Sequence, residues 1–271
     1  MKAFIQGIGI VGPGFSDWDT CHRVLTGLDG YHPSRCSDPS PTILPANERR
    51  RSSEVVRWAL EAAQQATQMA QTDPQQLPTV FASSGGETEI LHKICHSLTQ
   101  TPPMVSPTLF HQSVHNAAAG YWSIACTSQK ASTSLSCYDS SFAGGLLEAM
   151  TRLAVEQEDQ VLLVAYDIAA PPPLYEARPL TGPFAVALVL GNHPSPRAIC
   201  HVDVELLSES EQHTTTMDLP ELESLRAGNP AGHVLPLLQA LARNHDSLIF
   251  LDFLDNLQLQ IQIDPCQLYH E

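Results

Sequence analysis

One stretch, residues 131–167, constrains the fold of this chain more than any other. It has the sequence ASTSLSCYDSSFAGGLLEAMTRLAVEQEDQVLLVAYD. The pattern predicts a strand over 132–138, a tight turn at 139–140 and a helix over 141–157 that opens with small residues. A second, continuously apolar strand follows at 160–166. This strand–turn–helix–strand order favours an α/β fold.

The turn in this stretch lies where a helix begins, and that position has chemical consequences. Backbone N–H groups and the helix dipole stabilise negative charge there. The same geometry can lower the pKa of a cysteine and can form an oxyanion hole. An ordinary βαβ unit whose small-residue helix packs on a sheet has the same pattern. The stretch alone therefore leaves both interpretations open.

Strands and helices alternate over the rest of the chain, which predicts a layered α/β fold with a mixed central sheet. Further strands are expected at 2–11, 79–82, 184–190, 199–207, 248–253 and 257–263. Further helices are expected at 17–27, 54–71, 87–99, 108–127 and 231–243, with loops at 28–48 and between 207 and 231. Ser52 and Ser53 are expected to cap the helix over 54–71.

The charge balance narrows the choice of partners. Of the 271 residues, 29 are acidic and 14 basic, for a formal net charge of −15. Nucleic acids and anionic membranes both require a basic face, so neither is an expected partner. No run approaches the ~20 apolar residues of a membrane span, and no secretory signal is evident. We expect a soluble, cytoplasmic protein.

Cysteine usage agrees with a reducing compartment. The seven cysteines are odd in number and lack the spacing of a disulfide framework. They occupy positions 21, 36, 95, 126, 137, 200 and 266.

Five segments, in order, resemble the beta-ketoacyl synthase family of thiolase-fold proteins. They are KAFIQGIGIVGPGFSDWDTCHRVLTG, VFASSGGETE, HNAAAGYWSIA, ASTSLSCYDSSFAGGLLEAM and QVLLVAYD, which together span residues 2–167. The resemblance implies a single thiolase-like domain over 1–271 with a mixed central sheet. Residues 1–197 would form its well-matched N-terminal half, and residues 198–271 an abbreviated C-terminal half.

The resemblance places the nucleophile position of the family in the turn. In the family, this residue is the cysteine that carries the acyl chain. Counting from the flanking strands puts Ser140 at this position and leaves Cys137 three residues earlier, as a structural cysteine inside the strand. A serine hydroxyl stays protonated without a dedicated base, and serine is a favoured helix cap. We therefore expect Ser140 to cap the following helix.

The C-terminal half departs further from the family. Ketosynthases supply two histidines from this half, one of them in an H-G-T-x-T motif that this chain lacks. Gly232-His233 resembles the second histidine turn, but the lysine upstream of it is not matched, and Arg226 is the nearest basic residue. His233 is either a remnant of the site or a residue at a helix start that contacts the sheet. Several segments that wall the site in the family are shortened here.

We expect neither a metal nor a cofactor. His111 and His115 are four residues apart, but the zinc-peptidase glutamate and an evident further ligand are missing. The same holds for a second group on one predicted helix face, formed by His92, Cys95 and His96. The spacing Gly7-x-Gly9-x-x-Gly12 is that of a dinucleotide-binding loop, but no helix follows it, so it is interpreted as a turn.

Taken with the resemblance, these departures favour a non-condensing subunit of the chain-length-factor type. Such subunits pair with an active ketosynthase in type II fatty acid or polyketide assembly. The short length of this chain resembles that of the small ketosynthase-like subunits of aryl polyene pathways. The partner would carry out decarboxylative condensation and bind the acyl carrier protein, which this chain would meet only indirectly. Two alternatives stay open, namely an acyltransferase or thioesterase that uses Ser140 with His233, and a scaffold without a role in the tunnel.

In the family, the strand before the nucleophile pairs with its counterpart across a two-fold axis. Here that strand carries Leu135 but no charge or proline, the residues that usually protect a free edge. We therefore expect a heterodimer through the strand over 132–138 and the helix over 108–127. Phe110, Val114 and Tyr121 are the side chains expected to reach the partner's tunnel.

Overall fold

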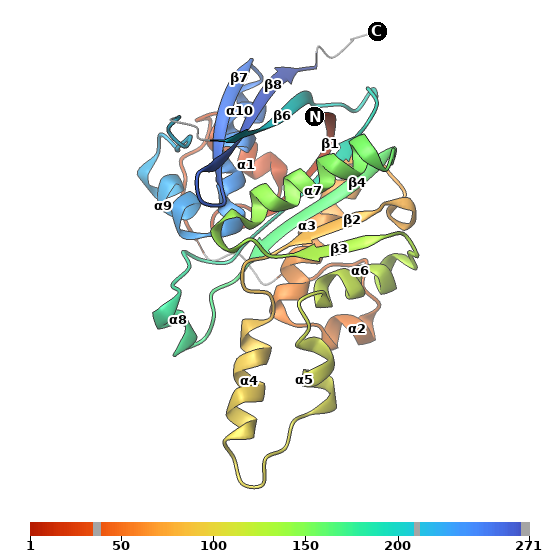
Figure 1. Cartoon of the computed structure of the whole chain (residues 1–271), viewed down its shortest axis with the longest axis vertical. Coiled ribbons are helices and arrows are strands. Elements are labelled where there is room, and N and C mark those ends of the chain that lie inside the picture. Colours follow the sequence, from red (N-terminus) through yellow and green to blue (C-terminus); the bar gives the residue numbers. More distant parts are fainter. Residues whose placement is uncertain (35–38, 209–211, 267–271) are drawn as a thin grey trace.

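The computed structural model describes residues 1–34, 39–208 and 212–266. Their strands form one mixed sheet in the order β3-β2-β4-β5-β1-β6-β8-β7 (Figure 1). The strands are β1 (Lys2–Val11), β2 (Thr79–Ala82), β3 (Ser132–Leu135), β4 (Gln160–Asp167), β5 (Phe184–Gly191), β6 (Cys200–Ser208), β7 (Ser247–Phe253) and β8 (Leu257–Pro265). Strand β2 runs parallel to β3 and β4, and the other neighbours are antiparallel. The mixed α/β sheet expected from the sequence is confirmed.

Helices cover both faces of this sheet. The α-helices are α1 (Trp18–Leu25), α2 (Ala46–Arg51), α3 (Glu54–Ala70), α4 (Thr88–Leu98), α5 (Pro107–Gln112), α6 (Ala117–Cys126), α7 (Ser141–Val155), α8 (Leu174–Ala177), α9 (Pro220–Gly228) and α10 (Leu235–Arg243). Short 3₁₀ turns are η1 (Pro74–Gln76), η2 (Tyr138–Ser140) and η3 (Pro230–Val234). As expected, Ser53 caps α3, since its hydroxyl accepts a hydrogen bond from the Val56 amide at 3.1 Å. Ser52 does not cap this helix, and its hydroxyl donates to the Arg49 carbonyl oxygen at 2.8 Å.

Two hydrophobic cores lie on opposite faces of the sheet. In one, α3 and α6 pack with Trp58 and Trp122 against side chains of β2, β4 and β5. In the other, α1, α7 and α10 pack against the reverse face. Helix α7 contacts β2 and β4 and also β7, which forms the opposite edge of the sheet. The sheet therefore curves around α7.

The glycines of β1 allow α3 to pack closely against the sheet. A Cβ at Gly7 would lie 2.2 Å from the carbonyl oxygen of Ala66, and one at Gly9 would lie 2.0 Å from that of Ala62. Both glycines lie inside β1. For Gly7 and Gly9 the interpretation as a turn is thus wrong, and close helix–strand packing explains them instead. The turn begins only at Gly12, which exchanges two backbone hydrogen bonds of 2.9 Å with Phe15.

The C-terminal strands repeat part of the N-terminal arrangement. Strands β6, β8 and β7 lie in the same order and the same mutual directions as β1, β5 and β4. Within the described residues, the second set lacks counterparts of β2 and β3. This topology supports our proposal that residues 198–271 form an abbreviated second half.

Four expected segments differ in the structure. The helix over 108–127 is broken into α5 and α6 by residues 113–116, a run of weak helix formers. Its His115 ring bonds to the carbonyl oxygen of Ser83 at 3.0 Å instead of continuing a helix. The strand over 132–138 ends at Leu135. Helices α2 and α9 lie in segments that we expected to be loops.

Three further features complete the description of the fold. The six cysteines within the described residues are free thiols, and Cys36 lies outside those residues. None of the described helices is both long and apolar enough to cross a bilayer. The hairpin of α4 and α5 projects from the body of the molecule (Figure 1).

Candidate functional site

The junction between β3 and the following helix forms a sharp elbow. Strand β3 ends where β2 ends, at the pair Ala82–Leu135, after which the Ser83 amide donates to the Leu135 carbonyl oxygen. Cys137 then precedes the 3₁₀ turn η2, and Tyr138 has a positive φ of 54°. This left-handed conformation is strained for a tyrosine. The expectation that Cys137 lies inside the strand is wrong, because β3 has no partner for pairing beyond Leu135.

Ser140 occupies the N-cap position of α7, but its hydroxyl makes no capping bond. Instead, this oxygen accepts a long hydrogen bond of 3.4 Å from the Leu254 amide. Ser141 closes the elbow, since its buried hydroxyl donates to the Tyr138 carbonyl oxygen at 2.6 Å and accepts from the Cys137 amide at 3.1 Å. Sequence reasoning missed Ser141, because two adjacent serines at a helix start give no signal to tell them apart.

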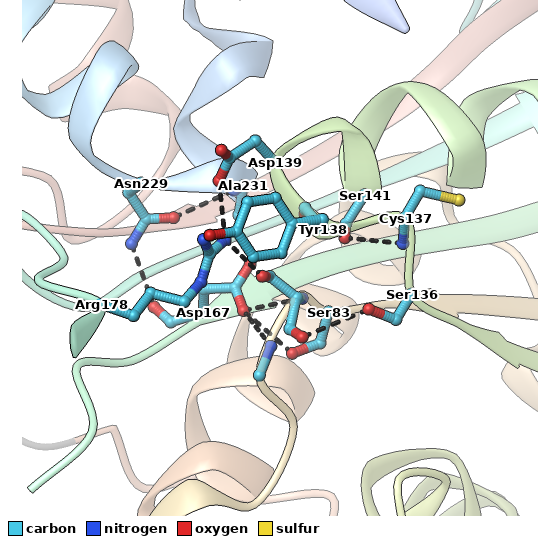
Figure 2. A network of polar contacts seen from close by, with 12 residues as sticks. Ser83, Ser136, Cys137, Tyr138, Asp139, Ser141, Asp167, Arg178, Asn229 and Ala231 are labelled. Carbon is cyan, nitrogen blue, oxygen red and sulfur yellow. Dashed lines mark hydrogen bonds and ion pairs between the residues drawn. The ribbon is translucent and has the colours of Figure 1, made fainter. Parts of the chain in front are cut away.

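The Cys137 thiol is not activated in this structure. Burial raises the pKa of the thiol, which disfavours the reactive thiolate. The sulfur lies against α7, because a Cβ built at Gly144 would be 2.6 Å from Sγ. Figure 2 shows this sulfur pointing away from the neighbouring polar network. Within the described residues, no histidine forms a hydrogen bond with it.

Asp167, at the end of β4, organises that polar network (Figure 2). Its Oδ1 accepts hydrogen bonds from the Ser83 hydroxyl at 3.0 Å and from the amides of Ser84 and Gly85 at 2.9 and 3.1 Å. Its Oδ2 is buried, and the described residues offer it no hydrogen-bond donor. Burial raises the pKa of Asp167 to about 7 despite these donors. The carboxyl group thus fixes the loop that follows β2.

Asn229 connects the C-terminal half to the same network. Its side chain is fully buried and donates to the carbonyl oxygens of Asp167 and Gly182 at 3.1 and 3.0 Å. Its Oδ1 accepts from the Ala231 amide at 2.9 Å and so caps η3. The Asn-Pro pair at 229–230 is a recognisable helix-start signal, and it could have identified this residue.

Arg178 holds the loop that follows β4 against the elbow. Its Nη2 donates to Ser84 Oγ and to Asp139 Oδ1, both at 2.6 Å. Its guanidinium also lies 3.6 Å from the centre of the Tyr138 ring, in a cation–π contact. A pocket of about 200 Å³ remains between this loop, η2 and η3. The polar groups at the elbow are therefore bonded to the chain's own side chains.

His233 lies in η3, which contacts η2. Its burial, with a smaller contribution from the positive charge of Arg226, lowers the pKa of the imidazole and favours its neutral form. Asp139 and Asp252 oppose this shift more weakly. Among the described residues, His233 has no hydrogen bond to Ser140 or Cys137. The structure therefore brings His233 near the elbow without forming a catalytic pair.

The residues expected at the partner interface lie on the β3 side of the molecule. Strand β3 forms an edge of the sheet and pairs only with β2 among the described strands. Phe110 and Val114 are 69% and 48% exposed. Leu135 is half-buried, and Tyr121 is buried with its hydroxyl bonded to Gln112 Nε2 at 3.0 Å. Tyr121 thus packs within this chain and does not protrude toward a partner, contrary to the expectation from the sequence.

The histidines considered as metal ligands are dispersed. His115 is bonded to a backbone carbonyl oxygen, whereas His92, Cys95 and His96 lie along α4. Over residues 1–34, 39–208 and 212–266, the structure brings together no group of three potential ligands.

Several solved structures share this fold. One is a ketosynthase, ApeO, in complex with its chain length factor, ApeC, from Xenorhabdus doucetiae, matched with 24% identity, a TM-score of 0.70, and 97% of this chain and 99% of that chain covered. The ishigamide ketosynthase/chain length factor matches with 13% identity, a TM-score of 0.74, and 98% and 100% covered. An acyl-carrier protein–ketosynthase complex, AntDE:AntF, matches with 11% identity, a TM-score of 0.75, and 98% and 99% covered.

Comparison of sequences identifies the family. No curated protein matches this chain. The family model described as the N-terminal domain of beta-ketoacyl synthase matches residues 22–252, which is most of the chain and reaches into β7. Together with the shared architecture, this match shows that the chain has the thiolase-like fold and belongs to the beta-ketoacyl synthase family.

Proposed function

We propose that this chain is a non-condensing subunit of the chain-length-factor type, which pairs with a catalytic ketosynthase in the cytoplasm. The pair would act in type II fatty acid or polyketide biosynthesis, with aryl-polyene-like assembly as the specific case. The observation that carries the proposal is the elbow. There burial raises the pKa of the Cys137 thiol and lowers that of the His233 imidazole, and no hydrogen bond among the described residues joins His233 to Cys137 or Ser140.

Condensation needs an activated thiol and groups that stabilise the developing charge. In this chain, the H-G-T-x-T segment is missing, and Arg178 already bonds Ser84 and Asp139 next to the elbow. A chain with this site is better suited to shaping a complex than to catalysing the reaction of that complex. Two of the similar structures are described as ketosynthase and chain length factor, which supports this choice.

The β3 edge supports the pairing. Among the described strands it pairs with β2 alone, so its other side is an open edge, and its sequence carries no lysine or proline to block another strand. Helices α5 and α6 lie on the same side of the molecule as β3 (Figure 1), and both Phe110 of α5 and Val114 between the two helices are exposed. We assign Phe110 to the partner's acyl tunnel. With a net charge of −15 on this chain, the partner is the better docking surface for an acidic carrier protein.

The alternative of an acyltransferase or thioesterase would require Ser140 to act with His233. No hydrogen bond joins these two residues in the described part of the chain, and the Ser140 hydroxyl accepts from the Leu254 amide. No observation at the site favours this alternative.

A condensation assay tests the proposal. The chain and the ketosynthase encoded in the same operon are purified together and given carrier-linked acyl and malonyl substrates. We expect product formation only when both chains are present, with undiminished rates for Cys137→Ala and Ser140→Ala in this chain. Turnover by this chain alone, or its loss in Cys137→Ala, would refute the non-condensing role. An acyl adduct on Ser140 in intact-mass analysis would favour the alternative enzyme.

A further inference from the structure

A groove of about 680 Å³ opens between α2, α5 and α6. Its floor is the face of α6 that carries Ala117, Gly120 and Tyr121. Helix α5 forms one wall, and Arg51 of α2 lies at the rim. The groove is separate from the elbow, and none of the residues that line it belongs to the network around Asp167.

The surroundings of the groove differ in charge from the rest of the molecule. Residues 90–138, which include α5, α6 and β3, contain no aspartate or glutamate, although the chain has 29 acidic residues. At the rim, Glu48 lies 4.0 Å from Arg51, so these two charges offset each other. Exposed Phe110 and Ile124 lie on α5 and α6. A neutral groove with exposed apolar neighbours suits an apolar segment of another protein better than a charged ligand.

The position of the groove points to one occupant. Helix α6 contacts both β2 and the edge strand β3, so the groove continues the surface at which we propose the partner pairs. When two chains of one fold pair about a two-fold axis, each presents an element that the other receives in the equivalent place. If Phe110 on α5 reaches into the partner, the partner's corresponding segment reaches back beside α5 of this chain.

We infer that the groove between α2, α5 and α6 receives an apolar side chain of the partner ketosynthase, from the partner segment that corresponds to α5. This inference rests on the proposed function and adds the receiving site on this chain. The pairing would then be reciprocal, with one apolar side chain exchanged in each direction across the interface.

Gly120 provides a direct way to fill the groove. A Cβ built at this position meets no atom within 4 Å, so an added side chain would extend into open space. Glycine weakens a helix, and its presence at an exposed position of α6 suits the close approach of another chain. Gly120→Ala leaves most of the groove open, whereas Gly120→Trp fills it.

Affinity for the operon's ketosynthase is measured for the wild-type chain and both variants. We expect Gly120→Trp to raise the Kd about tenfold or more, the scale of an interface hot spot. Gly120→Ala is expected to keep the wild-type affinity within about twofold and to raise the Tm. Leu28→Trp is the matched control, because Leu28 is 67% exposed and does not line the groove. Wild-type affinity in Gly120→Trp would overturn the inference.

A second measurement does not depend on how Gly120→Trp folds. A photoreactive benzoylphenylalanine replaces Thr108, which lines the groove, and the crosslinked peptides of the complex are sequenced. We expect crosslinks to an apolar segment of the ketosynthase. Crosslinks confined to this chain would overturn the inference, as would a homodimer of this chain that Gly120→Trp abolishes. If wild-type chains form no heterodimer at all, the proposed function fails together with the inference.

Discussion

Two carboxyl groups, those of Glu87 and Asp167, are buried near the ends of β2 and β4. Glu87 Oε1 accepts from the Ser53 hydroxyl at 2.6 Å, which joins the start of α4 to the start of α3. Its Oε2 is buried, and no donor reaches it within the described residues. Burial raises the pKa of each group to about 7. At the scale of single residues, the burial of these two carboxyl groups therefore makes the free energy of unfolding depend on pH.

The sign of this dependence follows from the raised pKa values. A carboxyl group whose pKa is higher in the folded state stabilises the fold most at low pH and loses this contribution as the pH rises through its folded-state value. We predict that the free energy of unfolding falls between about pH 4, near the ordinary pKa of these carboxyl groups, and about pH 7, their pKa in the folded state. Glu87→Gln should flatten this slope, whereas Glu205→Gln on the exposed side of β6 should not. Urea unfolding at several pH values measures both, and an unchanged slope in Glu87→Gln would contradict the prediction.

The serines of the elbow give a second test at this scale. Ser141→Ala removes two hydrogen bonds from a buried turn, so we predict a loss of about 1–2 kcal/mol in the free energy of unfolding. Ser140→Ala removes one long contact at 3.4 Å and should cost less than about 0.5 kcal/mol. Urea unfolding of the two variants side by side measures the difference. A larger loss in Ser140→Ala would show that Ser140, and not Ser141, holds the elbow.

At the scale of elements, the two edges of the sheet provide a matched comparison. Strand β3 forms one edge and β7 the other. We predict that Leu135→Lys on β3 abolishes pairing with the ketosynthase, because it places a charge in a strand that must approach another chain. Leu248→Lys on β7, where the leucine is 47% exposed, should leave pairing intact. Analytical size exclusion of each mixture measures both, and equal behaviour of the two variants would exclude β3 as the interface.

Phe110 tests the role of α5 in the tunnel. Its ring is 69% exposed, so Phe110→Ala removes little packing within this chain. We predict that the heterodimer persists while the length distribution of its products changes, as measured by mass spectrometry of the carrier-bound chains. Leu98→Ala on α4, at 57% exposure, serves as the control for loss of an exposed apolar side chain. An unchanged product distribution in Phe110→Ala would remove this residue from the tunnel.

The sequence predicted those elements that local signals determine. Strand β2 has the expected bounds, and α3 begins after its Ser53 cap, because apolar periodicity and capping act within a few residues. The break between α5 and α6 depends on His115 bonding to Ser83, a contact distant in sequence. Strand β3 is short because β2 is short, so residues 136–138 had no partner that a strand pattern could reveal. The Asp167 network was also missed, because its hydrogen bonds join residues that lie far apart in the sequence.

At the scale of the whole molecule, the described strands form two similar sets, and the C-terminal set is the smaller of the two. The N-terminal set of strands has β2 and β3, which form the edge proposed for pairing, and among the described strands the C-terminal set ends at β7 without counterparts of them. At the elbow, burial raises the pKa of the Cys137 thiol. Both features agree with the proposed role of this chain as a subunit that contributes structure to a two-chain enzyme.

Light scattering after size exclusion tests this conclusion most directly. The chain is mixed with the ketosynthase of its operon, and the molar mass of the eluted species is measured. We predict one species with the combined mass of one copy of each chain, which Leu135→Lys converts into two separate species. If the wild-type chains elute separately at all concentrations tested, this protein is not a partner subunit of that ketosynthase.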